Sequence, residues 1–184
     1  MKNISIRKNR EFYVDEAIRL KEIGLEDVET IFSTINNNRK YLSEWLPFIE
    51  ETLEESYSHS FVENYLNSDR KDLICSVFFS NQFVGIIGLK DTDFDNKKTE
   101  IGYWLSESFQ HHGIITKSCK VLIDFAFDEL KLNRIQIKAA KENFKSQRIP
   151  ERLGFKQEGI ELDGELHSRG FVDLVVYSLL KTDR

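Results

Sequence analysis

The sequence predicts a mixed α+β fold in which helices flank a central, twisted and mostly antiparallel sheet. Residues 25–67 repeat apolar side chains at helical spacing, whereas the stretch 73–105 alternates with a period of two, as strands do. A long helical pattern then separates these strands from three more strand patterns. The 184 residues fit one domain, 1–184, because globular domains cluster near about 100 to 200 residues.

The first part of the chain predicts one strand and three helices. Ala17–Ile23 is expected to be a strand, and Leu25–Asn36 has the apolar spacing of a helix. Two more helices are expected at about Arg39–Leu46 and Leu53–Asn67.

Three strands in succession predict an antiparallel meander. Leu73–Phe79 alternates along its length, and the polar pair Asn81-Gln82 separates it from the run Phe83–Leu89, which completes a hairpin. A turn at Asp95-Asn96 leads to the strand Thr99–Leu105.

The last part of the chain predicts a long helix, a strand, a short helix and two final strands. The long helix is Ile114–Leu130, and the strand Arg134–Ala140 is expected to lie beside the strand Thr99–Leu105. A short helix then ends at Gly154. The final strands are expected at Phe155–Leu162 and Phe171–Leu180, joined across Asp163-Gly164 and Gly170.

Composition narrows the classes of function. The chain has 26 Lys and Arg against 31 Asp and Glu, a net charge of −5, whereas a nucleic-acid binder normally carries a basic surplus. The longest apolar runs fall short of the roughly 18 residues of a membrane span, and the N-terminus has no apolar signal region. Cys75 and Cys119 lie in apolar patterns without a metal-site spacing, so both are expected to be buried thiols. We therefore expect a cytoplasmic protein with no nucleic acid, membrane or metal partner.

The stretch EIGYWLSESFQHHGIIT, residues 100–116, carries the clearest chemical signal. It predicts a strand, a short loop and a helix with Gly113 at its start. The first turn of a helix exposes unpaired backbone N–H groups and a partial positive charge, and a glycine lets a ligand approach closely. These features outline an anion site, to which Thr116 could add a hydroxyl. The alternative is that Gly113 only eases the turn into the helix.

A second polar pair follows the strand Arg134–Ala140. Asn143 and Ser146 stand at the start of NFKSQRIPERLGF, residues 143–155, close to the end of that strand. Either residue could instead cap the short helix, which is the commoner role of Asn and Ser at a helix start.

In four stretches the chain resembles the GNAT superfamily of acetyl-CoA-dependent N-acetyltransferases, and within it the ribosomal-protein serine acetyltransferase (RimL-type) branch. The stretches are YLSEWLPF at 41–48, residues 100–116, residues 143–155, and GFVDLVVYSLL at 170–180. The resemblance covers most of the chain from Ala17 onward. It implies a GNAT-like fold, acetyl-CoA as cosubstrate and an amine as acceptor.

The resemblance also implies a role for each matched position. The pyrophosphate loop of the family falls on Gln110, His111, His112, Gly113, Ile114 and Ile115, whose backbone N–H groups would hold the diphosphate. The pantetheine arm would lie along Tyr103, Trp104 and Leu105, and Asn143 would contact it. Ser146 matches the position that protonates or steadies the leaving thiolate, and Glu100 matches the general base.

Two residues depart from the family pattern. Ile115 replaces a small residue of the loop; it keeps a backbone N–H but adds bulk. Pro150 stands where many relatives have a tyrosine acid, and it removes a helix hydrogen bond to about Ser146, so a kink is expected. Stabilisation of the thiolate would then fall to Ser146 or to water.

Amine chemistry favours a protein N-terminus as the acceptor. At pH 7 about a tenth of an α-amine, with a pKa of about 7.7 to 8.0, is neutral, against well under a hundredth of a lysine amine. Glu100 would remove the amine proton, directly or through a water, which typically contributes about 10² to 10⁴ in rate. The alternative for Glu100 is a solvated strand residue paired with a lysine such as Lys98.

Three functions stay open. The first is acetylation of a protein α-amine such as a ribosomal-protein N-terminus; the second is acetylation of a small amine such as a polyamine or an aminoglycoside. The third is a binding module that keeps CoA without turnover, which the departures at Ile115 and Pro150 would allow. Trp45 and Pro47 are expected either to line an acceptor funnel or to be core, and Asp173 and Tyr177 to be structural. The sequence is compatible with a homodimer but does not set the oligomeric state.

Overall fold

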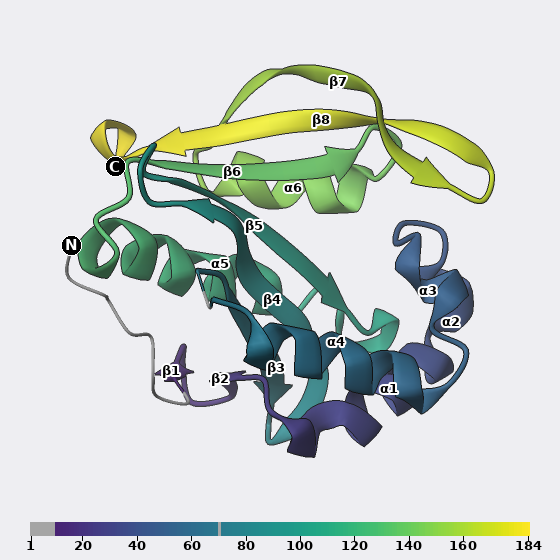
Figure 1. Ribbon diagram of the computed structural model, residues 1–184. Coiled ribbons are helices and arrows are strands. Elements are labelled where there is room, and N and C mark those ends of the chain that lie inside the picture. Colours follow the sequence, from purple (N-terminus) through teal and green to yellow (C-terminus); the bar gives the residue numbers. More distant parts are fainter. Residues whose placement is uncertain (1–9, 70) are drawn as a thin grey trace.

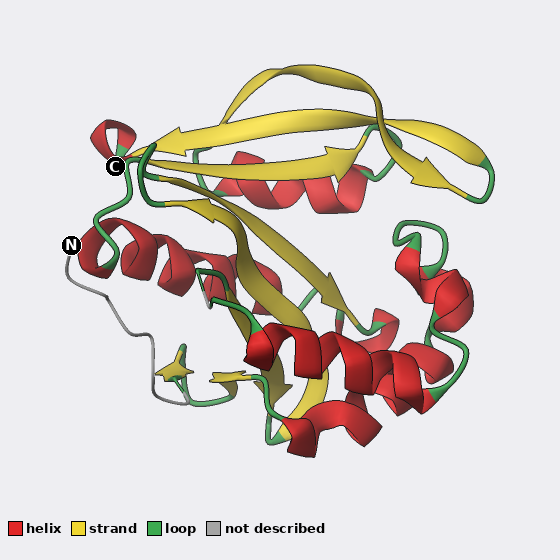
Figure 2. Ribbon diagram, viewed as in Figure 1, coloured by secondary structure: helices red, strands yellow, loops and turns green. Residues whose placement is uncertain are grey.

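The computed structural model describes residues 10–69 and 71–184, which form an eight-stranded sheet with helices on both faces (Figures 1 and 2). The strands lie in the order β1-β2-β3-β4-β5-β6-β8-β7. Every neighbouring pair is antiparallel except β5 and β6, which are parallel. The strands are β1 (Glu11–Tyr13), β2 (Ile18–Glu22), β3 (Leu73–Phe79), β4 (Gln82–Asp93), β5 (Lys98–Leu105), β6 (Arg134–Ala140), β7 (Lys156–His167) and β8 (Gly170–Leu180). The predicted mixed fold is confirmed.

The helices divide between the two faces of the sheet. One group consists of the 3-10 turn η1 (Leu25–Asp27), α1 (Val28–Asn37), α2 (Arg39–Leu42), α3 (Phe48–Glu51) and α4 (Glu55–Asn67). The other consists of α5 (Ile114–Asp124), extended by the π-helical turn η3 (Phe125–Glu129), and α6 (Phe144–Arg152). Two further 3-10 turns, η2 (Glu107–Phe109) and η4 (Lys181–Asp183), follow β5 and β8.

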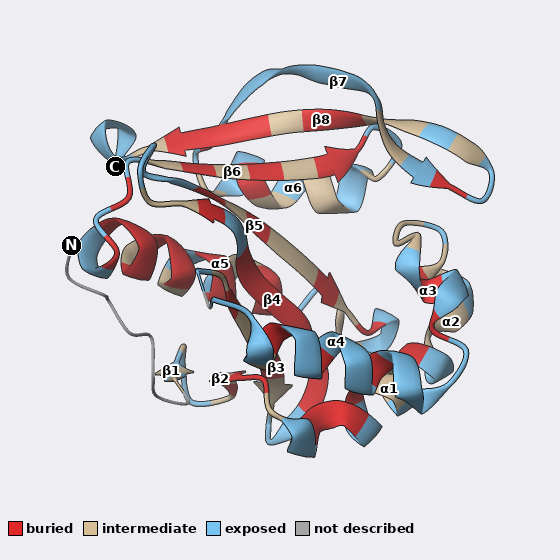
Figure 3. Ribbon diagram, in the orientation of Figure 1, coloured by how far each residue is buried: buried red, intermediate tan, exposed pale blue. Residues whose placement is uncertain are grey.

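Two apolar cores lie on opposite faces of the sheet, and β5 contributes to both. Ile101 and Tyr103 pack in the core that contains Cys119 of α5, whereas Trp104 packs in the core that contains Ile31 of α1 and Val62 of α4. This is the alternation expected of a strand covered on both faces. Figure 3 shows that β4 is buried along most of its length, whereas buried and half-buried residues are interspersed along β5.

The sequence places most elements closely, but it misses one break in a helix and predicts one break in a strand that the structure does not have. The helix expected at Arg39–Leu46 ends at Leu42, and a separate helix, α3, begins after Pro47, because a residue before proline disfavours helical backbone. The turn expected at Asp163-Gly164 is instead a β-bulge, and β7 continues to His167. Asp163 absorbs the bulge with a φ of 50°.

The parallel pair β5 and β6 separates soon after it begins. Three residue pairs join the strands, from Lys98 with Arg134 to Glu100 with Gln136, and the strands then diverge (Figure 1). Beyond Glu100 the backbone of β5 on its β6 side is therefore free of strand pairing. A strand edge of this kind can pair with the peptide groups of a ligand.

Among residues 10–69 and 71–184, no helix is long and apolar enough to cross a membrane. The same residues contain no cluster of three or more His, Cys, Asp or Glu side chains arranged to hold a metal ion.

Candidate active site

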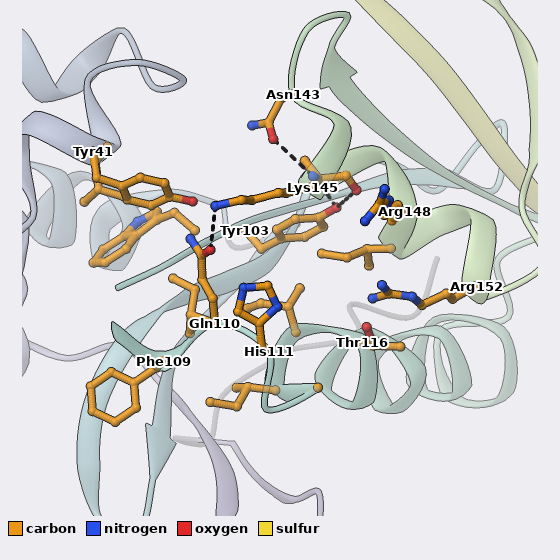
Figure 4. A pocket seen from close by; sticks show the side chains of 18 of the residues that line it. Tyr41, Tyr103, Phe109, Gln110, His111, Thr116, Asn143, Lys145, Arg148 and Arg152 are labelled. Carbon is orange, nitrogen blue, oxygen red and sulfur yellow. Dashed lines mark hydrogen bonds between the residues drawn. The ribbon is translucent and has the colours of Figure 1, made fainter. Parts of the chain in front are cut away.

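A cavity of about 410 Å³ lies where β5 and β6 diverge (Figure 4). Its size falls within the usual range of small-ligand sites. The end of β5, the loop after it, the first turn of α5, one face of α6 and residues of α2 form its walls. It brings together most of the residues singled out in the sequence: Tyr103, Trp104, Leu105, Gln110, His111, Gly113, Ile114, Ile115, Thr116, Asn143 and Ser146.

The start of α5 forms one wall of the cavity and presents open backbone donors. Gly113 has a φ of 71°, a left-handed conformation that side chains other than glycine rarely adopt, and no described side chain caps the helix. The first helical hydrogen bond joins the Lys117 N–H to the Gly113 carbonyl at 3.0 Å. The N–H groups of residues 114–116 thus lie at the open, positive end of the helix.

A row of cations on α6 forms the opposite wall. Lys145, Arg148 and Arg152 line the cavity, and their spacing of three and four residues places them on one face of the helix. Lys145 Nζ donates to Gln110 Oε1 at 3.0 Å and lies 5.8 Å from the centre of the Tyr41 ring, so it bridges α6, the loop and α2. Together with the start of α5, these cations fit a ligand with phosphate groups.

This cationic row was not among the residues predicted from the sequence. The signal was present as three basic residues at helical spacing. It was overlooked because the sequence does not show which face of a short helix turns toward the start of α5.

Ser146 lies in the cavity wall with two restraints on its position. Its backbone N–H donates to Asn143 Oδ1 at 3.1 Å, so Asn143 caps α6, as the alternative interpretation held. The Tyr103 hydroxyl lies 3.1 Å from the Ser146 carbonyl oxygen and 3.2 Å from Ser146 Oγ. Burial raises the pKa of Tyr103, so the phenol stays protonated at neutral pH.

Glu100 lies at the point where β5 and β6 separate, but it does not line the cavity. It shares a face of β5 with Gly102 and Trp104, so it lies on the opposite face of the sheet from Tyr103 and from α6. Groups on the two faces of the sheet can approach each other through the gap between β5 and β6.

The partner of Glu100 differs from the lysine named in the sequence analysis. Glu100 Oε1 lies 2.8 Å from Nζ of Lys90, which is its neighbour in register on β4, rather than from Lys98. Burial lowers the pKa of Lys90, but its hydrogen bond to Glu100 and the nearby carboxylates outweigh this effect, and the pKa lies above its usual value. The Glu100 carboxylate thus has a charged partner.

The two histidines of the loop take different positions. His111 lines the cavity and has a φ of 68°. His112 does not line it; its ring centre lies 5.4 Å from that of Phe79. Both residues are exposed, as expected for adjacent histidines in a turn.

A second cavity of about 480 Å³ adjoins the first and shares Tyr41, Asn143 and Lys145 with it. Its walls include Trp45 and three carboxylates, Glu44, Glu107 and Glu142. Trp45 is therefore placed beside a cavity, as one of the two interpretations of this residue held. Pro47 lines neither cavity.

The remaining candidates have structural surroundings. Cys75 and Cys119 are buried and unpaired, and burial raises the pKa of both thiols. Asp173 pairs with Lys141 at 3.1 Å. The Tyr177 hydroxyl lies 3.4 Å from Gln147 Oε1 and 3.3 Å from Glu151 Oε1, both on α6. None of these four lines the main cavity.

Comparison with known proteins identifies relatives over nearly the whole chain. The family model described as an acetyltransferase (GNAT) domain matches residues 17–156. The chain is 36% identical over 173 residues to YdaF of Bacillus subtilis, provisionally named a ribosomal N-acetyltransferase, with 92% of this chain and 94% of that protein covered. It is 27% identical over 169 residues to the ribosomal-protein-serine acetyltransferase of Escherichia coli, with coverage of 90% and 93%. The crystal structure of the microcin C7 self-immunity acetyltransferase MccE in complex with acetyl-CoA and AMP is 27% identical, with a TM-score of 0.84 over 91% of this chain and 94% of that one.

Proposed function

Because this chain belongs to the GNAT family of acetyltransferases, we propose that it acetylates the α-amine of a protein N-terminus, with a ribosomal protein as the acceptor. The chain is an acetyl-CoA-dependent N-acetyltransferase. The acceptor is the part that is proposed, and the single observation that carries it is the 36% identity to a relative named for ribosomal acetylation. The chemistry agrees, since an α-amine is far less protonated at pH 7 than a lysine amine.

The residues of the cavity fit the cosubstrate. We propose that the N–H groups at the start of α5, with Lys145, Arg148 and Arg152, hold the diphosphate. The unpaired edge of β5 beyond Glu100 would pair with the amide groups of the pantetheine arm. Acetyl-CoA supplies the activated acyl group, and everything else in the reaction is positioning and proton transfer.

The two predicted catalytic residues would act from opposite faces of the sheet, Glu100 as a proton acceptor and Ser146 as a hydrogen-bond donor. The neutral amine forms a C–N bond to the acyl carbon as the C–S bond breaks. Glu100 would take the proton released by the amine nitrogen, directly or through one water. Ser146, on the other side of the gap, would donate a hydrogen bond to the sulfur as it becomes a thiolate.

A small amine is the second candidate acceptor, and one observation favours it. The adjoining cavity carries Glu44, Glu107 and Glu142 beside Trp45. Lys40 and Lys145 also line it, and the remaining excess of carboxylates together with the indole suits a cationic amine. A peptide terminus would also enter through this cavity, with its chain leaving toward solvent. The two candidate acceptors therefore differ in how strongly their binding depends on the three carboxylates.

An acceptor screen read by release of free CoA thiol tests the proposal. Peptides with different first residues are compared with small polyamines and aminoglycosides at the same concentration. We expect the highest kcat/KM for a peptide α-amine, and a loss of that activity when the peptide is blocked at its N-terminus. A preference for polyamines that disappears in Glu44→Gln or Glu142→Gln would replace the peptide by the second candidate. Binding of CoA without turnover on any amine would favour the non-catalytic module.

Site variants test the two catalytic roles in the same assay. Glu100→Gln should lower kcat by about 10² to 10⁴ if it acts as the base. Ser146→Ala should lower kcat with a smaller effect on the KM for acetyl-CoA. Glu63→Gln, an exposed change on α4 outside both cavities, is the charge-matched control. Turnover unaffected by Glu100→Gln and Ser146→Ala would refute these roles.

A further inference from the structure

The helix α6 lacks one hydrogen bond at the residue that faces the cavity. Pro150 lies inside α6 and has no N–H, so it cannot donate to the carbonyl of Ser146, four residues earlier. The Tyr103 hydroxyl from β5 lies 3.1 Å from that same carbonyl oxygen. A phenol of the sheet thus supplies the donor that the proline removes from the helix.

The same phenol also reaches the side chain of Ser146. Tyr103 Oη and Ser146 Oγ are 3.2 Å apart, and either can be the donor. The carbonyl can only accept, and the phenol has one proton. When the Tyr103 hydroxyl donates to the Ser146 carbonyl, the phenol oxygen can accept a hydrogen bond from the Ser146 hydroxyl. When the Tyr103 hydroxyl instead donates to Ser146 Oγ, the hydroxyl proton of Ser146 is free to turn toward the cavity.

We propose that Tyr103 is a positioning residue that holds the Ser146 hydroxyl for the leaving sulfur, and that Pro150 leaves the Ser146 carbonyl open, so that the phenol proton is shared between this carbonyl and Oγ. The inference rests on the proposed role of Ser146. As the C–S bond breaks, Ser146 Oγ–H donates to the sulfur and the Tyr103 hydroxyl rotates from the carbonyl to Oγ. Both protons stay on their own oxygens, so the step needs no further acid or base.

The alternative orientation of Ser146 shows why a positioning residue matters. A serine within a helix readily turns its hydroxyl back to a carbonyl three or four residues earlier, here Asn143 or Glu142. A hydroxyl bonded in that way would not face the sulfur. Tyr103 competes with this arrangement because it offers Oγ a second partner on the cavity side.

The first test compares Tyr103→Phe with Tyr177→Phe. Tyr177 is a matched control because its phenol also reaches α6 from the sheet, from β8, but contacts Gln147 and Glu151 and lies outside the cavity. Loss of one hydrogen bond between uncharged groups should lower kcat by up to about tenfold in Tyr103→Phe, with little change in the KM for acetyl-CoA. An equal loss in Tyr177→Phe would mean that Tyr103 only supports the helix, and would overturn the proposal.

A double-mutant cycle separates action through Ser146 from independent action. If Tyr103 acts through Ser146, adding Tyr103→Phe to Ser146→Ala should change kcat by less than twofold. If the two losses instead multiply, Tyr103 acts on its own and the positioning role is wrong.

A titration without acceptor keeps the inference distinct from the proposed function. The ultraviolet absorbance of the thiolate gives the pKa of the CoA thiol bound to the protein. We expect this pKa to rise by up to about one unit in Tyr103→Phe, the equivalent of the tenfold loss in kcat. An unchanged thiol pKa would overturn the inference. A wild-type protein that binds CoA but acetylates no amine would instead refute the proposed function, and the titration would still decide the role of Tyr103.

Pro150→Ala provides a second variant with the opposite expected sign. An alanine at this position restores an N–H that can donate to the Ser146 carbonyl, which leaves the phenol proton for Oγ. The pKa of the bound thiol should therefore fall in Pro150→Ala. A rise in that pKa would contradict the proposal even if Tyr103→Phe does not fold.

Discussion

The cationic row on α6 predicts how much affinity for acetyl-CoA is lost when its arginines are replaced. Arg148 and Arg152 line the cavity opposite the start of α5, and both are exposed. A hydrogen bond to a charged group contributes about 1.5 to 3 kcal/mol, and solvent screening at exposed positions reduces this to about 1 kcal/mol for each arginine. The double variant Arg148→Gln/Arg152→Gln should thus lose about 2 kcal/mol of acetyl-CoA binding, a roughly thirtyfold weaker Kd.

Calorimetry with acetyl-CoA measures this loss directly, and kinetics should agree with it. These side chains lie away from Glu100, so the KM for acetyl-CoA should rise while kcat changes little, as expected for contacts made equally before and during the reaction. The difference from wild type should shrink at high salt, because exposed charges are screened. Arg184→Gln removes an exposed arginine that pairs with Asp124 and Asp128, away from the cavity, and is the control. An unchanged Kd in the double variant, or an equal loss in Arg184→Gln, would refute the reasoning.

Three further predictions follow from particular contacts. Cys75→Ala and Cys119→Ala should keep acetyl-CoA-dependent turnover, because in the proposed reaction the amine attacks the thioester directly and neither thiol takes part. Loss of turnover in a folded Cys119→Ala protein, checked by circular dichroism, would indicate a covalent intermediate instead. Gly113→Ala should lower the free energy of unfolding by about 1 kcal/mol, since the φ of 71° strains any side chain while the nearest atom to an added Cβ is 4.0 Å away; a loss of several kcal/mol in urea denaturation would point to a clash instead. Hydrogen bonds from Arg134 and Ser178 lower the pKa of Glu158 to about 2, so the stabilising contribution of its carboxylate is complete above the unfolded pKa near 4.5 and is lost as the pH falls toward 2. Glu158→Gln should therefore make the free energy of unfolding slightly less dependent on pH between about 4.5 and 2; the effect is small because the carboxylate is partly exposed. An unchanged dependence on pH would contradict this prediction.

Local pattern was enough to predict the elements whose faces are strictly apolar. The strand at Arg134–Ala140 was predicted to the residue, and the helix expected at Ile114–Leu130 corresponds to α5 and its π-helical extension. The predictions were wrong where one short sequence pattern is compatible with two local structures. Asp163-Gly164 suits a hairpin turn and a bulge equally well, and only the pairing of β7 with β8 selects the bulge.

The candidate site was predictable where it depends on neighbours in sequence. The glycine at the start of α5 and the cap at Asn143 belong to this class. Contacts set by strand register or by helix orientation were not predictable. Glu100 faces Lys90 rather than Lys98 because of the β4–β5 register, and Tyr103 meets Ser146 across 43 positions of sequence.

A crystal structure of the protein with bound CoA tests the central claim most directly. We expect the diphosphate on the N–H groups of residues 114–116, and the sulfur in the gap between β5 and β6, within hydrogen-bond reach of Ser146 Oγ. A diphosphate bound away from the start of α5, or a sulfur that cannot reach Ser146, would contradict the account.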